Sequence, residues 1–292
     1  MMTSLPRKYR IVATDLDGTL LDKSHKVPDV NKKALAALHA SGVSVILCTG
    51  RSSATALPIL STLGFDTHVI CFNGSCLLAP AAADGKREVL FERRLPAELN
   101  QRVFELAARH GHTVNVYDGD YVFAVCKSET HRALIDRYRA LTGCTYEVVE
   151  SYERWQSRAV FKMLVLTGEE GARPFLEAAQ REFDPATCHL ILGEYFVEFL
   201  CPATHKGVAV RSLCEQLSCG LDAVVGFGDG RNDREFLSTV GMGIAVANAA
   251  PETKEAAARV SEFEHHQMAV AKELQLLFPD ELKDVCVSEV RD

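Results

Sequence analysis

The length, composition and charge of the chain exclude several classes of protein. At 292 residues it exceeds the usual size of one domain, so two domains are expected. Hydrophobic residues make up 47% and charged residues 24%, which excludes a disordered, collagen-like or low-complexity chain. The net charge of −7 argues against a nucleic-acid-binding protein, so no nucleic-acid partner is expected.

The sequence gives no indication of export or of membrane insertion. The ten cysteines form no C-x-x-C pair, so we interpret them as reduced thiols in or near the core. The apolar stretch that follows the basic residues near the N-terminus covers only 11–14, which is too short for a signal peptide. No run of 18 apolar residues is present. We therefore expect a cytoplasmic protein with no membrane partner.

The first eighty residues alternate short apolar strands with amphipathic helices. Strands are expected at 10–16, 43–48 and 68–72. A helix over 29–40 would have Asp29 as its N-cap and end at Gly42, and a second helix follows at about 53–63. Strand–helix–strand units at this spacing predict parallel strands joined by right-handed crossovers.

The same alternation returns near the C-terminus, after a middle segment of different character. At the C-terminal end the pattern predicts helices at 206–217, 232–240 and 251–258, with strands at 223–227 and 243–246. The middle segment predicts helices at 96–110 and 128–141, a strand at 160–167, and a hairpin formed by 188–192 and 195–200. We interpret 84–199 as an inserted α/β domain, and 1–83 with 200–292 as one discontinuous, Rossmann-like α/β core built on a parallel sheet.

Four short polar motifs lie where a predicted core strand ends or a core helix begins. They are Asp15-Leu16-Asp17-Gly18, Thr49-Gly50-Arg51, Lys206-Gly207, and the segment from Gly228 to Asp233, which contains Asp229 and Asn232. Ligands of open α/β sheets bind outside the carboxyl ends of the strands, so these motifs are expected to converge on one crevice. Each motif alone has an ordinary structural explanation, such as a helix cap at Thr49 or a surface lysine at 206. Their combination in this order favours a functional site.

The residues of these motifs fit phosphoryl transfer through a covalent aspartyl intermediate. Their carboxylates could bind Mg²⁺, and Asp15 could then attack phosphorus as a nucleophile. Asp17, two residues away, could protonate the leaving oxygen and later deprotonate the attacking water. Gly18 would allow the sharp turn that brings Asp17 back, while Thr49 and Lys206 would hold the phosphoryl oxygens.

The four motifs resemble those of the haloacid dehalogenase superfamily and occur in the same order. The chain is most similar to the Cof-like phosphatase branch, whose cap domain is inserted between the second and third motifs. The resemblance covers about residues 8–83 and 200–275, whereas the middle segment is similar only in position and length. It implies a hydrolase with a parallel-sheet catalytic core and an inserted cap that determines substrate specificity.

The resemblance also implies a role for each site residue. Asp15 would be the nucleophile and a Mg²⁺ ligand, and Asp17 the general acid/base that gives the metal its backbone carbonyl. Thr49 and the Gly50 backbone would bind phosphate, and Lys206 would neutralise it. Three further roles complete the site: Asp229 as a metal ligand, Asn232 on the phosphate side, and Asp233 as support for the metal or for Lys206.

Several functions remain open at this level. The leading hypothesis is a Mg²⁺-dependent phosphatase of small phosphorylated metabolites, with sugar phosphates as the first class and pyridoxal phosphate, flavin mononucleotide and other nucleotides as alternatives. A phosphosugar mutase or phosphotransferase and a non-catalytic Mg²⁺- or phosphate-binding module are the other candidates. A carbon–halogen hydrolase is disfavoured because it would leave Asp17 and Asp229 without a task. The expected oligomeric state is a monomer or a loose homodimer.

Overall fold

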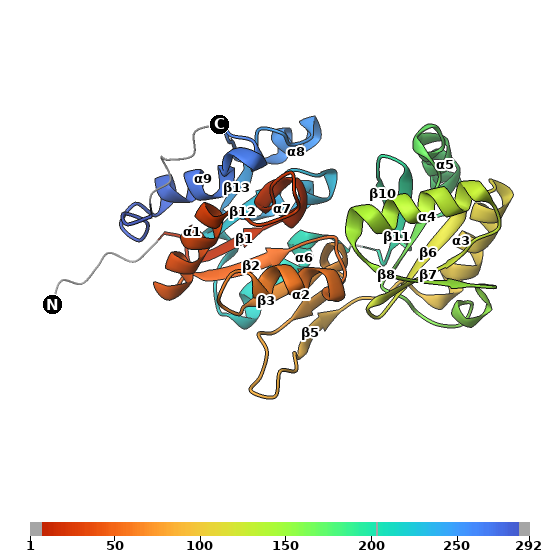
Figure 1. The fold of residues 1–292 in the computed structure, drawn as a ribbon, viewed down its shortest axis with the longest axis horizontal. Coiled ribbons are helices and arrows are strands. Elements are labelled where there is room, and N and C mark those ends of the chain that lie inside the picture. Colours follow the sequence, from red (N-terminus) through yellow and green to blue (C-terminus); the bar gives the residue numbers. More distant parts are fainter. Residues whose placement is uncertain (1–7, 203, 286–292) are drawn as a thin grey trace. The chain divides into compact units, whose positions relative to one another are not determined.

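The computed structural model describes residues 8–202 and 204–285, and these form two compact units. The first unit contains the described residues up to Gly50, Ala56–Phe91, and those from His205 onward. The second contains Arg51–Thr55 and Glu92–Thr204. The predicted ends of the core, 1–7 and 286–292, lie outside the described residues, as does Cys286. Figure 1 labels the elements of each unit.

The first unit is built on an eight-stranded sheet with helices packed against it. The strand order is β14 (Arg259–Val260), β13 (Met242–Ala245), β12 (Val224–Gly228), β1 (Ile11–Thr14), β2 (Ser44–Cys48), β3 (His68–Cys71), β4 (Cys76–Leu78) and β5 (Val89–Glu92). The helices are α1 (Asp29–Ala40), α2 (Ser53–Ser61), α6 (Lys206–Gln216), α7 (Arg234–Thr239), α8 (Pro251–Ala256) and α9 (Ala269–Leu277).

The centre of this sheet is parallel, which places the motif-bearing strand ends side by side. β1 lies between β12 and β2 and pairs in parallel with both, so that Thr14 is level with Phe227 and Leu47. β3 continues the parallel arrangement beside β2. The carboxyl ends of these strands therefore meet at one edge, as open α/β sheets require for a ligand site. The expected parallel-sheet α/β core is confirmed.

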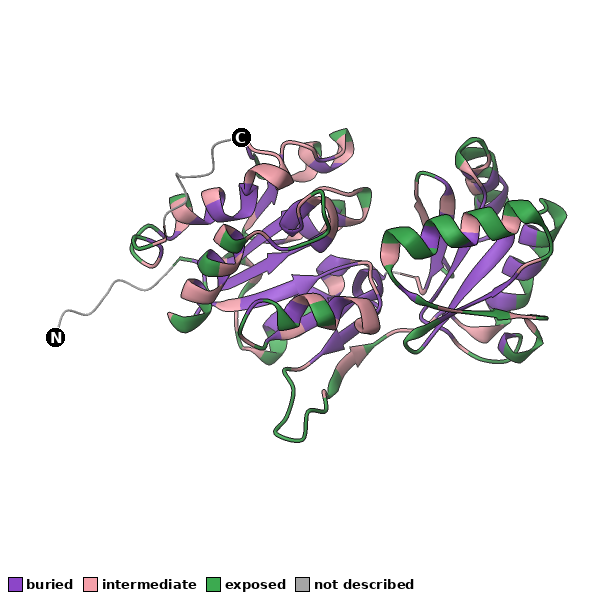
Figure 2. Cartoon of the chain, in the orientation of Figure 1, coloured by how far each residue is buried: buried purple, intermediate pink, exposed green. Residues whose placement is uncertain are grey.

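Helices cover both faces of this sheet. Alternate residues along a strand point to opposite faces, and Ile11 and Ala13 of β1 share one buried cluster with residues of α6 and α7. α1 lies against β2 and α9 and contributes Ala34, Leu35 and Leu38 to the core without joining that cluster. The central strands β1, β2, β3 and β12 are consequently buried on both faces and read in the sequence as continuous apolar runs, whereas the outer strands β5 and β14 are partly or fully exposed (Figure 2).

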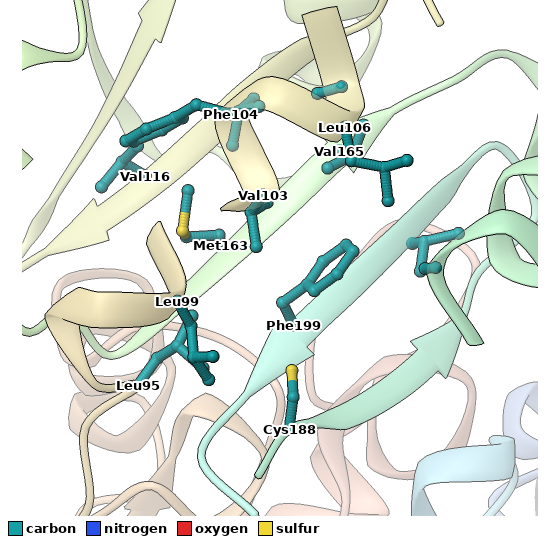
Figure 3. Packing of buried hydrophobic residues seen from close by; sticks show 14 of the residues in the cluster. Leu95, Leu99, Val103, Phe104, Leu106, Val116, Met163, Val165, Cys188 and Phe199 are labelled. Carbon is teal, nitrogen blue, oxygen red and sulfur yellow. The ribbon is translucent and has the colours of Figure 1, made fainter. Parts of the chain in front are cut away.

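The second unit has a sheet and a hydrophobic core of its own. The strand order is β10 (His189–Leu192), β11 (Phe196–Leu200), β9 (Lys162–Leu166), β6 (Thr113–Asp118), β7 (Tyr121–Val125) and β8 (Thr145–Val149). The helices are α3 (Ala97–Arg109), α4 (Glu129–Thr142) and α5 (Glu169–Glu182). β10 and β11 form the predicted hairpin. Leu99 and Val103 of α3 pack with Met163, Val165 and Phe199 of the sheet (Figure 3).

Some expected details differ in the structure. The first helix spans the expected residues, but Pro28 occupies the N-cap and Asp29 is the first helical residue, so the prediction of Asp29 as the cap is wrong. Asp29 instead accepts a hydrogen bond from Lys32 at 3.2 Å. Apart from Arg51–Thr55, the second unit begins at Glu92 rather than at 84, because β5 extends the first sheet. The helix expected at 232–240 begins two residues later, after one 3₁₀ turn.

Two further expectations concern membrane-spanning helices and the cysteines. Within the described residues, no helix combines the length and the apolar composition needed to span a bilayer. Most of the cysteines that the structure describes are buried, which agrees with their interpretation as small core residues.

Candidate active site

A wide helical turn after β1 carries the first motif. Asp15 follows the strand directly, and Leu16–Leu20 form the turn, in which Asp17 and Gly18 leave helical geometry. Gly18 has φ of +70°, and a Cβ atom at this position would lie 2.3 Å from Oδ2 of Asp229. Only glycine fits both the backbone conformation and the close approach. The turn therefore brings the chain after Asp15 against the motif that follows β12.

A buried lysine joins the ends of two strands. Lys206 is the first residue of α6, and its side chain is fully buried. Its Nζ donates to Oδ1 of Asp15 at 2.5 Å and to Oδ1 of Asp233 at 2.7 Å. Because a buried ammonium is costly unless it is paired, these two carboxylates account for the position of Lys206. The third motif thus meets the first and the fourth, as the sequence predicted for a common crevice.

The fourth motif holds its own loop together through Asp233. Oδ2 of Asp233 accepts hydrogen bonds from the backbone N–H groups of Asp229 and Gly230, each at 3.0 Å. Oδ1 of Asp229 accepts from the hydroxyl of Thr19 at 3.1 Å, across from the first motif. With both oxygens engaged by Lys206 and the backbone, Asp233 is placed to support Lys206 and the Asp229 loop.

The electrostatics of the cluster follow from burial and mutual repulsion. Burial raises the pKa of Asp15 well above its usual value; Lys206 lowers it, while Asp233 and Asp229 raise it further. Burial and repulsion from Asp233 raise the pKa of Asp229 to about 7. Burial alone would lower the pKa of Lys206, but Asp15 and Asp233 outweigh it and the pKa is raised. The site therefore holds one ammonium among three carboxyl groups, and two of these, Asp15 and Asp229, keep a proton to higher pH than an exposed aspartate does.

Three carboxylates are close enough together to hold a metal ion. One oxygen each from Asp15, Asp229 and Asp233 lies within 4.8 Å of the others. Hard oxygen ligands of this kind are those that Mg²⁺ takes in proteins, together with water and substrate phosphate. A divalent cation would also relieve the repulsion that raises the carboxyl pKa values. The residues present thus fit the ion that the sequence resemblance implies.

Asp17 stands apart from this cluster. Its side chain is 46% exposed, and Oδ1 lies 3.6 Å from Nδ1 of His25. Its carboxylate is not among the three that gather. A metal contact through Asp17 would therefore involve its backbone carbonyl, as the resemblance implies.

The remaining predicted residues surround the carboxylates from β2 and from the fourth motif. Thr49 directly follows β2 and is fully buried. At Gly50, a Cβ atom would lie 2.7 Å from Oδ1 of Asn73. Asn232 donates through Nδ2 to the same oxygen of Asn73 at 2.8 Å. Asn73, which follows β3, thus links the Thr49-Gly50 segment to Asn232.

Sequence reasoning missed several residues that shape the site. Thr19 bonds Asp229, and Asn248 donates to the carbonyl of Gly18 at 2.8 Å while accepting from the N–H of His265 at 2.8 Å. The available signal was positional, since Asn73 follows a parallel strand next to a glycine and Asn248 follows the strand β13.

Comparison with known proteins identifies the family. The chain matches the model of the haloacid dehalogenase-like hydrolases over residues 12–274. An HMP-PP phosphatase of Yersinia pseudotuberculosis serotype O:1b (strain IP 31758) is 27% identical over 249 residues, which cover 85% of this chain and 87% of that protein. The chain therefore belongs to the haloacid dehalogenase-like hydrolases and is an enzyme of the hydrolase class.

Solved structures show the same fold. A haloacid dehalogenase-like hydrolase from Bacteroides thetaiotaomicron superimposes with a TM-score of 0.79 at 21% identity, covering 93% of this chain and 100% of that one. The sugar phosphatase BT4131, described as a member of subclass IIB, gives 0.77 at 22% identity over 91% of this chain and 98% of that one. The expected family and its α/β architecture with an inserted cap are confirmed.

Proposed function

We propose that the protein is a Mg²⁺-dependent phosphatase that hydrolyses small phosphomonoesters, sugar phosphates first among them, through an aspartyl-phosphate. The observation that carries the proposal is the grouping of Asp15, Lys206 and Asp229 at the carboxyl ends of neighbouring parallel strands. The names of an HMP-PP phosphatase and of the sugar phosphatase BT4131 support phosphate ester hydrolysis as the reaction. The substrate of the enzyme is then a small phosphorylated metabolite. We expect the enzyme to act in the cytoplasm as a monomer or loose homodimer.

In the first step, a carboxylate oxygen of Asp15 attacks phosphorus and the bond from phosphorus to the leaving oxygen breaks. Asp17, whose carboxyl is half-exposed and is not one of the three clustered carboxylates, gives its proton to that oxygen. In the second step, water attacks phosphorus and Asp17 takes up a proton from it, while the bond between phosphorus and the Asp15 oxygen breaks and inorganic phosphate leaves. Asp15 and Asp17 are then back in their starting states.

The other residues hold the phosphoryl group while these bonds change. Lys206 lies 2.5 Å from Asp15, so a phosphoryl group on Asp15 would have its charge balanced by the ammonium. Thr49 and the backbone of Gly50 would donate to phosphoryl oxygens, and Asn232 would contact the phosphate from the fourth motif. Stabilising the charge of a loose transition state is the main task in phosphoryl transfer.

Mg²⁺ would be held by Asp15, Asp229 and the backbone carbonyl of Asp17, with Asp233 in support. When bound, the ion supplies charge neutralisation between the Asp15 carboxylate and a phosphate dianion. The fit rests on three carboxylate oxygens within 4.8 Å of one another and on the pKa of Asp229, which burial and repulsion raise to about 7 in the absence of a cation.

A phosphate-release assay tests the proposal. The purified protein with an aryl phosphate should release inorganic phosphate with Mg²⁺ and lose this activity when a chelator removes the ion. Asp15→Asn should abolish turnover, because the amide cannot act as the nucleophile, and Asp29→Asn, at an exposed position at the start of α1, serves as the matched control. Substantial turnover by Asp15→Asn would contradict the nucleophile assignment.

Isomerisation of a phosphosugar without phosphate release would favour the mutase instead. A panel of phosphorylated metabolites would then identify the substrate.

A further inference from the structure

The turn that follows β3 has left-handed backbone at three consecutive residues. Phe72, Asn73 and Gly74 have φ of 52°, 56° and 97°, so all three lie in the left-handed region. This conformation is ordinary for glycine and tolerated by asparagine, but for a bulky residue such as Phe72 it is an outlier. Strained backbone persists only where its surroundings enforce it, and it concentrates at functional sites.

The surroundings that enforce this turn are on both sides of it. The Phe72 side chain is fully buried. The N–H of Asn73 donates to the carbonyl of Thr49 at 3.1 Å, and the N–H of Ser75 donates back to the carbonyl of Phe72 at 3.1 Å. The turn is therefore fixed to the end of β2 as well as to its own strand, although neither contact requires an asparagine side chain at position 73.

The same turn touches the loops of three separate motifs. Oδ1 of Asn73 accepts from Nδ2 of Asn232 at 2.8 Å and lies so close to Gly50 that a Cβ there would be 2.7 Å away. A Cβ at Gly74 would lie 2.4 Å from the carbonyl oxygen of His205 and 3.0 Å from the backbone nitrogen of Lys206. Asn73 thus contacts the phosphate loop at Gly50 and the side chain of Asn232, and Gly74 contacts the start of the helix that carries Lys206.

We propose that the turn Phe72–Gly74 positions the phosphate-binding groups of the site and that Asn73 is a positioning residue acting through Asn232 and Gly50. The proposal deepens the proposed phosphatase function and rests on it. Asn73 meets two requirements at once, because it accepts left-handed backbone and places an acceptor oxygen at the end of a short side chain. Its carboxamide holds the Asn232 side chain in the orientation that faces the phosphoryl group.

Two substitutions separate the backbone from the side chain. Asn73→Gly keeps the left-handed turn and the clearance at Gly50 but removes the acceptor. Asn73→Asp keeps both the acceptor oxygen and a tolerance for left-handed backbone, and adds a negative charge. Ser218→Gly is the matched control, because Ser218 also has a left-handed φ, of 48°. It lies directly after Leu217, the C-cap of α6, at the opposite end of that helix from Lys206.

Steady-state kinetics with an aryl phosphate and Mg²⁺ give the first test. Asn73→Gly should lower kcat roughly 10- to 100-fold, the loss expected when a reacting group is misplaced by a fraction of an ångström to an ångström. Asn73→Asp should keep a kcat several-fold above that of Asn73→Gly while KM rises, because its charge repels a phosphate dianion. Ser218→Gly should match the wild type. An unchanged kcat in Asn73→Gly, or equal losses for both substitutions, would overturn the proposal.

A double-mutant cycle with Asn232→Ala gives the second test. If Asn73 acts through Asn232, adding Asn73→Gly to Asn232→Ala should lower kcat little further, since coupled residues are non-additive. Full additivity would show that Asn73 acts elsewhere.

A crystal structure of Asn73→Gly separates failure of this inference from failure of the proposed function. If the wild type released no phosphate from any phosphomonoester, the proposed function would fail, but the structure would still report on the positioning role. A displaced Asn232 side chain would support that role, and an unmoved one would refute it.

Discussion

At the scale of single residues, the balance of charge around Lys206 decides the character of the site. One buried ammonium lies against Asp15 and Asp233, with Asp229 close by. Two of these carboxyl groups have raised pKa values because they are buried together. Three carboxyl groups around a single ammonium form an oxygen-rich site of the kind that binds a divalent cation and then its phosphate ligand.

The exposed carboxyl of Asp17 leads to a prediction about leaving groups. In Asp17→Asn no proton can be given to the leaving oxygen, and general acid catalysis typically contributes about 10²- to 10⁴-fold. The loss in kcat/KM should therefore be large for alkyl phosphates, which leave poorly, and small for nitrophenyl phosphate, which needs little protonation. Kinetics over a series of leaving groups checks this. An equal loss across the series would contradict the acid role of Asp17.

The raised pKa of Asp229 leads to a prediction about pH. In the folded metal-free chain this pKa is about 7, against a usual value of 3.8. Between about pH 4 and pH 7 folding takes up a proton at Asp229, so the contribution of this group to stability falls as the pH rises through that window. Mg²⁺ requires the deprotonated carboxylate, so its binding competes with this proton.

The gain in Tm that Mg²⁺ produces should consequently be larger at about pH 8 than at about pH 6. Thermal unfolding with and without the ion at both pH values measures it. Asp229→Asn should remove most of the gain and its pH dependence. An equal gain at both pH values would rule out Asp229 as the group that controls metal affinity.

At the scale of elements, the site depends on strand ends and on the tight turns that follow them. β12, β1 and β2 end level with one another, and each passes directly into a functional residue. The wide turn Leu16–Leu20 then returns the chain to Asp229, and the turn Phe72–Gly74 reaches Gly50 and Lys206. The strands fix the positions of the motifs, and the turns fix their mutual orientation.

Gly18 provides the sharpest test at this scale. Gly18→Ala would be strained at φ of +70° and would place a methyl group 2.3 Å from Oδ2 of Asp229. Gly64→Ala is the matched control, because its φ of +80° imposes similar strain with nothing within 4 Å of the new atom. Both should lose about 1–2 kcal/mol of stability from the backbone alone, but only Gly18→Ala should also lose Mg²⁺-dependent activity. Unfolding curves and activity assays of the two variants would show this, and full activity in Gly18→Ala would contradict the close approach.

Sequence periodicity located most of these elements. Buried strands are continuous runs of apolar residues, and helices that pack on one side have apolar residues at helical spacing. The helix 29–40 has the expected length, yet its cap was assigned to Asp29 although Pro28 occupies that position. The motif residues Asp15, Lys206, Asp229 and Asp233 gather as expected. Asn73 and Asn248 were not predicted as site residues, since their roles depend on contacts with residues 159 and 230 positions away in the chain.

At the scale of the whole molecule, each unit has a core of its own. The core of the second unit contains Phe199, which is fully buried and packs against Phe175 and Phe183, with ring centroids 6.3 Å and 5.2 Å away. The first unit has a separate cluster that contains Phe236. Units with separate cores can unfold separately, so damage to one core is expected to remain largely local.

Phe199→Ala should therefore destabilise the second unit by about 3–5 kcal/mol, the usual cost of removing a buried phenylalanine ring. Calorimetry should show one part of the unfolding transition moving to lower temperature while the Mg²⁺-sensitive part, which belongs to the first unit, stays in place. Phe236→Ala should produce the converse. A single transition that moves as a whole in both variants would show that the units unfold together.

The sequence by itself determined the class of fold, the positions of the central strands and the identity of the charged motif residues, because all of these are local in the chain or follow from the order of parallel strands. Tertiary structure alone decided which of those residues touch. Lys206 pairs with Asp15 across 191 positions of sequence and with Asp233 across 27, and Asp17 remains outside the carboxylate cluster although it lies only two residues from Asp15. The physical reason is that burial and charge pairing act between neighbours in space, and the turns after β1 and β3 select those neighbours.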